Sequence, residues 1–170
     1  LALCLHAFAL LRDALSPSDF ARTQLVVAGG WDPRVKENVE HKQELESLAR
    51  ELDIAHAVAF KASFSNEERA LMLSEATAVV YTPSEEHFGI VPLEAMYCRR
   101  PVIACNSGGP TESVIHDRTG FLCDSSPAAF SAAMRRLLEE PSLGPAMGEA
   151  GRRRVAEEFS LDSFARQLDG

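Results

Sequence analysis

Two carboxylates, Glu86 and Glu94, lie eight positions apart directly behind an apolar segment. On one α-helix, eight residues turn about 800° and rise about 12 Å, so the two acids would not act together there. They can act together if Glu86 lies in a loop and Glu94 lies in the first turn of the helix that follows. Gly89 permits unusual backbone angles and close approach, and Pro92 suits the first helical position. The pattern therefore predicts a loop that leads into a helix N-terminus.

Such a helix N-terminus is suited to binding an anion. Free amide groups near Gly89, Ile90 and Val91 would point outward and bind a phosphate. Glu94 would repel that anion, so its better role is to accept hydrogen bonds from neutral hydroxyls, such as those of a ribose. Glu86 could accept them from a sugar beyond the phosphates. The residues predict a nucleotide-sugar site, although Glu near a helix N-terminus is favoured by about 0.3–1 kcal/mol whatever its function.

The pattern of apolar residues predicts strands and helices that alternate along the chain. Short β-branched or aromatic runs predict strands at 24–28, 57–60, 78–81, 101–104 and 120–123. Amphipathic or capped segments predict helices at 3–15, 34–52, 69–76, 91–99, 110–115, 127–140, 143–159 and 160–168. This alternation is typical of the α/β class, with a Rossmann-like parallel sheet covered by helices on both faces.

The loops that follow the strands are expected to meet at one edge of the sheet. Open parallel sheets bind ligands beyond the carboxyl ends of their strands. Gly29 and Gly30 would form either a plain turn or a close approach to a bound nucleotide sugar. Lys61 would lie either beside the nucleotide base or in solvent. Gly108 and Gly109 would form either a tight turn from a strand to a helix, which is the favoured interpretation, or a contact with the ligand.

Composition limits the classes of function. The 170 residues fit one domain, and the net charge of −8 argues against general nucleic-acid binding. No stretch reaches the roughly 18 apolar residues of a membrane span, and residues 1–15 lack the features of a signal peptide. Four cysteines without C-x-x-C spacing and five scattered histidines predict reduced thiols and no metal site. Because the chain begins with Leu1, we expect a fragment of a longer protein.

The segment 86–101 resembles the E-x7-E signature of the family 4 retaining glycosyltransferases, which have the two-domain GT-B architecture. The likeness continues at 101–104, 106–112 and 120–123. A narrower likeness, at 28–41 and 81–96, is to the GDP-mannose-dependent mannosyltransferases of dolichol-linked oligosaccharide assembly. The similarity extends from about residue 24 to residue 168.

The resemblance implies that residues 1–170 form the donor-binding half of a GT-B enzyme, with a helical tail at about 143–170 and no N-terminal acceptor domain. The reaction would be transfer of mannose from GDP-mannose, with retention, to a lipid-linked (dolichyl diphosphate) oligosaccharide. The candidate catalytic residue is Glu86. The candidate donor-binding residues are Glu86, His87, Phe88, Gly89, Ile90, Val91, Glu94, Gly29, Gly30 and Lys61.

No cofactor or metal is implied, because in this family an Arg and a Lys neutralise the leaving diphosphate. Those cations normally lie upstream of the region of similarity, and no equivalent pair is visible before Gln24. The chain alone is therefore not expected to turn over. The implied partners are a nucleotide sugar and a lipid-linked acceptor, without nucleic acid, and any membrane contact would come from regions outside this chain. The implied location is the cytosolic face of the endoplasmic reticulum membrane.

Three alternatives stay open. A donor domain of the same family could use UDP- or ADP-sugars. A non-catalytic nucleotide-binding or interaction module could use the tail helices to bind a partner. A GT-B epimerase would need a catalytic histidine opposite the site, and none is evident in the sequence.

Overall fold

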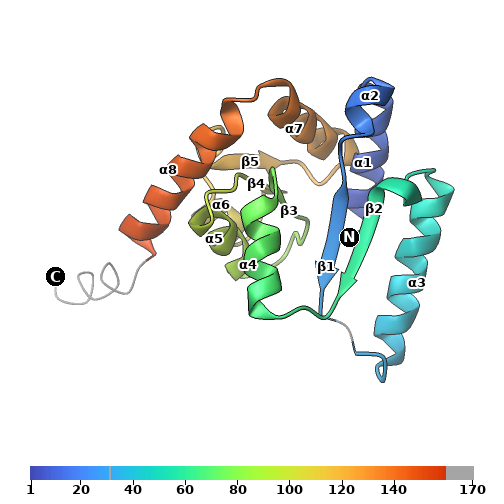
Figure 1. The fold of residues 1–170 in the computed structure, drawn as a ribbon. Coiled ribbons are helices and arrows are strands. Elements are labelled where there is room, and N and C mark those ends of the chain that lie inside the picture. The colour runs from blue at the N-terminus through green and yellow to red at the C-terminus, as the bar shows by residue number, and fades with distance from the viewer. Residues whose placement is uncertain (31, 160–170) are drawn as a thin grey trace.

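Parallel strands and helices alternate along residues 1–30 and 32–159, the part of the chain that the computed structural model describes (Figure 1). The strands are β1 (Leu25–Gly29), β2 (Val58–Ala62), β3 (Val79–Tyr81), β4 (Val102–Cys105) and β5 (Gly120–Cys123). The helices are α1 (Ala2–Ala14), α2 (Pro17–Phe20), α3 (Lys36–Glu51), η1 (Ala55–Ala57), α4 (Asn66–Glu75), α5 (Ile90–Tyr97), α6 (Pro110–Ser113), α7 (Pro127–Glu139) and α8 (Leu143–Glu158).

The predicted elements are present, and their ends differ from the predicted ends by up to three residues. The largest shift is at α4, which begins at Asn66 instead of residue 69 because Ser65 and Glu68 cap it reciprocally. The Ser65 hydroxyl accepts from the Glu68 amide at 3.2 Å, and the Glu68 carboxylate accepts from the Ser65 amide at 2.8 Å. The short helices α2 and η1 were not predicted. The helical segment predicted at 160–168 lies outside the described residues.

The parallel sheet is divided into two hydrogen-bonded parts. One pairs β1 with β2, and the other has the order β3-β4-β5. A single hydrophobic core nevertheless spans both parts, since Val27 of β1, Phe60 of β2 and Val80 of β3 pack against it. Helix α1 contributes fully buried side chains to that core and packs on both α7 and α3. The division is thus one of backbone pairing, not of packing.

The burial of β4 explains why this strand is apolar along its whole length. All four of its residues are buried. Ile103 and Cys105 join the core under α1 and α7, whereas Val102 and Ala104 join a second cluster under α5. Successive residues of a strand point to opposite faces, so helices cover both faces of this part of the sheet. The predicted α/β architecture is confirmed.

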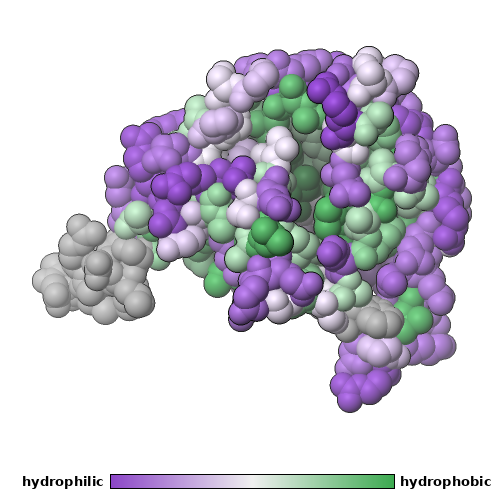
Figure 2. All heavy atoms as spheres, viewed as in Figure 1, coloured by the Kyte–Doolittle hydropathy of each residue, from purple (hydrophilic) through white to green (hydrophobic). Residues whose placement is uncertain are grey.

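The strands β1 and β2 are less covered than β4. Val26 of β1 is 42% exposed, and Leu71 on the nearby α4 is 56% exposed. Figure 2 shows hydrophobic residues on this face, over β1, β2 and α4, framed by hydrophilic ones. None of the helices in the described ranges is both long and apolar enough to cross a bilayer.

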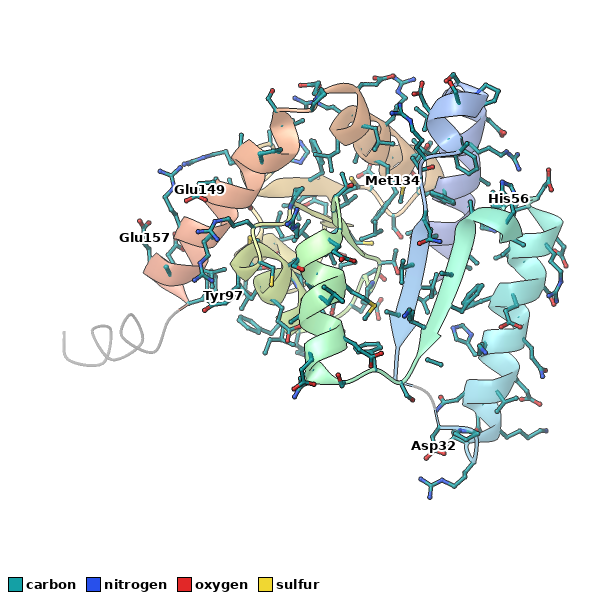
Figure 3. All side chains as sticks on the ribbon, in the orientation of Figure 1. Asp32, His56, Tyr97, Met134, Glu149 and Glu157 are labelled. Atoms are coloured by element: carbon teal, nitrogen blue, oxygen red, sulfur yellow. The ribbon has the colours of Figure 1, made fainter. Side chains whose placement is uncertain are left out.

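Two arginines of α8 fix this helix to the ends of two others. Arg152 donates to the Tyr97 carbonyl at 2.9 Å, and its guanidinium lies 3.4 Å from the centre of the Tyr97 ring. Arg154 donates to the Ser113 carbonyl at 2.8 Å. Tyr97 ends α5 and Ser113 ends α6, so these side chains satisfy carbonyls that have no helical partner. Figure 3 shows Tyr97 beside the C-terminal part of α8.

Candidate functional site

The loop 82–89 carries the chain from β3 to the start of α5. Gly89 caps the helix with a left-handed backbone, φ 70°. A Cβ at this position would lie 2.8 Å from the Tyr81 hydroxyl, so both conformation and space require glycine. Within the described residues, no side chain caps α5. The amides of Ile90 and Val91 therefore have no capping side chain from that part of the chain, and their binding of an anion stays a prediction.

The helix α5 begins earlier than predicted, so the predicted helical positions of Pro92 and Glu94 were wrong. Because α5 starts at Ile90, Pro92 is its third residue and not its first. The third position tolerates proline, since the first four amides of a helix have no intrahelical partner. Glu94 is consequently the fifth residue and lies in the second turn instead of the first. The wider prediction holds: Glu86 lies in the loop and Glu94 lies on the helix.

Glu86 is held by two contacts although the residue is exposed. Its main-chain carbonyl accepts from the Gly109 amide at 2.8 Å. Its carboxylate accepts a hydrogen bond from the Tyr81 hydroxyl. Burial of Tyr81, together with this bond and the Glu86 charge, raises the pKa of Tyr81 to about 12. The Tyr81 hydroxyl is neutral at physiological pH and lies next to the Glu86 carboxylate.

The glycines at 108 and 109 do more than form the predicted turn. A Cβ at Gly109 would overlap the main-chain carbonyl of Phe88. The Ser107 hydroxyl, in the same segment, donates to the Ser84 carbonyl at 2.6 Å. The favoured turn is present between β4 and α6, and these residues also pack backbone to backbone against the loop that carries Glu86. The segment 106–109 is thus one support of the candidate site.

Glu94 has a charged partner that the sequence did not indicate. Nη2 of Arg69, on α4, lies 2.6 Å from Oε2 of Glu94, and the side chains are 37% and 29% exposed. This oxygen is buried and has no well-directed hydrogen bond in the described part of the chain, so the contact is an ion pair by distance. The prediction gave Glu94 only neutral hydroxyls as partners. Nothing in the spacing of Arg69 and Glu94 signals their contact, which depends on how α4 and α5 pack.

Among the remaining predicted residues of this segment, His87, Phe88 and Ile90 are exposed and Val91 is partly buried. His87 is exposed, and Ile90 is 62% exposed. The Phe88 ring lies 6.4 Å from the Phe159 ring at the end of α8. The structure therefore brings the predicted residues of 86–91 together around the start of α5.

Gly29, Gly30 and Lys61 lie at the carboxyl end of the other part of the sheet. The Ser63 amide donates to the Gly29 carbonyl at 3.1 Å, and Lys61 is in register with Ala28. Gly29, Gly30 and Lys61 are exposed, and a Cβ at either glycine would meet nothing within 4 Å. The helix α4 follows β2 and carries Arg69, so the Arg69–Glu94 pair connects this region to the E-x7-E segment.

Metal-binding clusters were also sought. In residues 1–30 and 32–159, no three His, Cys, Asp or Glu side chains gather in a way that could hold a metal ion. The four cysteines are free thiols, as the sequence predicted.

Comparison with known proteins assigns the chain to a family. The family model for glycosyl transferases group 1 matches residues 1–154, so the chain belongs to that family. The chain is 52% identical to alpha-1,3/1,6-mannosyltransferase ALG2 of Homo sapiens over 168 residues, which are 99% of this chain and 40% of that protein. It thus spans about 40% of the length of this curated relative.

Solved structures share the fold. Sucrose-phosphate synthase from Thermosynechococcus elongatus superposes with a TM-score of 0.80 at 30% identity, over 98% of this chain and 40% of that one. HepE from Anabaena, solved in complex with UDP, superposes with a TM-score of 0.82 at 20% identity, over 98% of this chain and 43% of that one. These superpositions confirm the predicted fold class.

Proposed function

We propose that this chain is the nucleotide-sugar-binding domain of a retaining mannosyltransferase. In the full-length enzyme, mannose would pass from GDP-mannose to a dolichyl diphosphate oligosaccharide at the cytosolic face of the endoplasmic reticulum membrane. The observation that carries the proposal is the 52% identity to the human mannosyltransferase over 99% of the chain. The acceptor-binding domain and any membrane contact belong to regions outside this chain.

In the proposed site, each part of the donor has a partner. The diphosphate binds the free amides at the start of α5, where the helix dipole also favours an anion. Glu94, one turn further along α5, accepts from the ribose hydroxyls. Glu86 contacts the mannose, and the Tyr81 hydroxyl fixes the direction of its carboxylate. His87 and Phe88 line the same loop, and Gly29, Gly30 and Lys61 provide the opposite side, near the base.

The proposed transfer uses no metal or cofactor. Support comes from the family resemblance, in which protein cations neutralise the leaving diphosphate. Addition of EDTA should leave the transfer rate of the full-length enzyme unchanged, whereas a metal-dependent reaction would stop.

The first test is calorimetric titration of the chain with GDP-mannose, GDP and UDP-glucose. We expect the two guanine ligands to bind and UDP-glucose not to bind. Glu94→Ala should weaken GDP binding at least about tenfold, since a charge-assisted hydrogen bond contributes about 1.5–3 kcal/mol. Glu149→Ala is the matched control, because Glu149 is also ion-paired, to Arg99 at 2.9 Å, but lies on α8.

Each other outcome is informative. Binding of UDP-glucose would favour a family member with another donor. Binding of GDP with no preference for the mannosyl group would favour a non-catalytic nucleotide-binding module. If no ligand binds at millimolar concentration, the titration is repeated with the chain joined to the acceptor domain of the human relative. If no ligand binds in that experiment either, the proposed donor site is refuted.

A further inference from the structure

We infer that Arg69 is a positioning residue for the nucleotide ribose, because it holds the Glu94 carboxylate in the direction from which Glu94 accepts the ribose hydroxyls. The inference rests on the proposed function and adds a residue outside the E-x7-E segment to the donor site.

The contact between the two side chains is close and half-buried. Nη2 of Arg69 lies 2.6 Å from Oε2 of Glu94, and that oxygen is shielded from water. A carboxylate oxygen taken out of water needs a compensating partner, and Arg69 provides one. An ionised carboxylate has two oxygens and about four acceptor positions. The single contact to Oε2 therefore orients the group and leaves acceptor positions for hydroxyls.

The position of Arg69 is itself well defined. It lies one turn after Ser65, where the reciprocal Ser65–Glu68 hydrogen bonds fix the start of α4. A cation near a helix N-terminus opposes the helix dipole, so Arg69 is not placed there to stabilise α4. No residue of α4 is fully buried, so this helix is only lightly anchored by apolar packing. The ion pair to Glu94 is consequently a contact that locates α4 against α5.

A structural role and a role in ligand positioning make different predictions. A purely structural pair would affect the binding of every nucleotide alike. A pair that directs Glu94 toward the ribose affects only nucleotides with hydroxyls for Glu94 to contact. The ligand 2′,3′-dideoxy-GDP lacks both of these hydroxyls and retains the base and the diphosphate.

The experiment compares GDP with 2′,3′-dideoxy-GDP by calorimetry in four proteins: unmodified, Arg69→Lys, Arg69→Gln and Arg22→Gln. Arg69→Gln should weaken GDP binding about tenfold and dideoxy-GDP binding less than about threefold, since a misdirected acceptor loses its charge-assisted bonds. Arg69→Lys keeps the charge and should restore most of the affinity for GDP. Arg22→Gln is the control, since Arg22 pairs with Asp19 at 2.7 Å and is 80% exposed.

Two results would overturn the inference alone: an equal loss for both nucleotides, or no loss for either, in a protein that binds GDP. Failure of the unmodified protein to bind GDP would instead refute the proposed function, and this inference with it. If Arg69→Gln does not fold, the comparison is made with Arg69→Lys and with Glu94→Gln. In a Glu94→Gln background, the Lys substitution should then have no further effect on GDP binding, and an additional loss would contradict the inference.

Discussion

Two regions of the molecule carry glycines at the predicted donor site, and they are built in opposite ways. At the paired loops 82–89 and 106–109, the glycines are in contact with other backbone or with Tyr81. At the carboxyl ends of β1 and β2, the space around Gly29 and Gly30 is open. The first region is fixed by the protein itself. The second region leaves open space that a ligand can fill. Substitutions there should therefore change ligand binding and not the free energy of unfolding.

Gly109→Ala should have the largest effect on stability. The new Cβ would overlap the carbonyl of Phe88. Because the Phe88 atoms that it meets are backbone atoms, the clash is relieved only by a shift of the loop that holds Glu86. Overpacking of this kind typically costs about 1–3 kcal/mol, and a backbone clash should be at the upper end. Urea denaturation should therefore show a loss of about 3 kcal/mol in the free energy of unfolding.

Gly144→Ala is the control for that substitution. Gly144 is in α8, and a Cβ there would meet nothing within 4 Å. Alanine in a helix is favoured over glycine by about 0.5–1 kcal/mol, so this variant should be more stable than the parent. Equal effects of the two substitutions would show that the backbone contact at Gly109 has no energetic importance.

Gly89→Ala should have the next largest effect, about 2 kcal/mol of destabilisation. The residue combines a left-handed φ of 70° with a Cβ position 2.8 Å from the Tyr81 hydroxyl. Adding Tyr81→Phe removes the nearest atom and should recover part of the loss, while the backbone strain remains. Thermal unfolding of the two variants measures this recovery. Absence of any recovery would place the whole cost in the backbone conformation.

The pH dependence of stability tests the raised pKa of Tyr81. The pKa of Tyr81 rises from an ordinary value of 10.0 to about 12 in the folded protein, chiefly because of burial and then because of Glu86. The folded state therefore binds this proton more tightly. Its contribution is complete below about pH 10 and is lost as the pH rises through about 12.

Tyr81→Phe should remove about 1 kcal/mol of that alkaline dependence, a value reduced for partial solvent exposure. The buried thiols Cys4 and Cys123, whose pKa values are raised to about 11, act in the same direction in both proteins and cancel in the comparison. Parallel alkaline unfolding curves for the parent and the variant would contradict the raised pKa of Tyr81.

Gly30→Ala should have the smallest effect on stability, within about 0.5 kcal/mol, because it introduces no clash. Under the proposed function it should still weaken GDP-mannose binding several-fold, since a methyl group there narrows the approach of the donor. Unfolding and calorimetry on the same sample separate the two effects. A substantial loss of stability would mean that the two regions do not differ as described.

Most of the fold was predictable because its signals are local. Short β-branched runs identify the strands, and the Ser65–Glu68 capping pattern indicates that a helix follows, although α4 begins three residues before the predicted residue 69. The loop-then-helix arrangement of Glu86 and Glu94 was also predictable, because one glycine and one proline constrain the chain between them. The exact start of α5 was not, since proline is tolerated throughout the first helical turn.

The features that could not be predicted depend on tertiary packing. Arg69 and Glu94 are 25 positions apart and meet only because α4 and α5 lie against each other. The contact of Gly109 with Phe88 likewise joins two loops whose spacing in sequence carries no signal. The divided sheet has the same origin, because apolar strands look alike whether or not their edges are paired.

That division of the sheet has a consequence for handling the protein. In the described residues, the division leaves β1 and β3, as well as β2 and β5, with one edge each whose amide and carbonyl groups lack a strand partner. Both β1 and β3 are short and rich in valine, and Val26 of β1 is exposed. Unpaired edges of this composition are templates for strand addition from another molecule. We therefore expect concentrated solutions of this chain to associate through backbone pairing at β1 and β3, and short extended peptides to suppress that association.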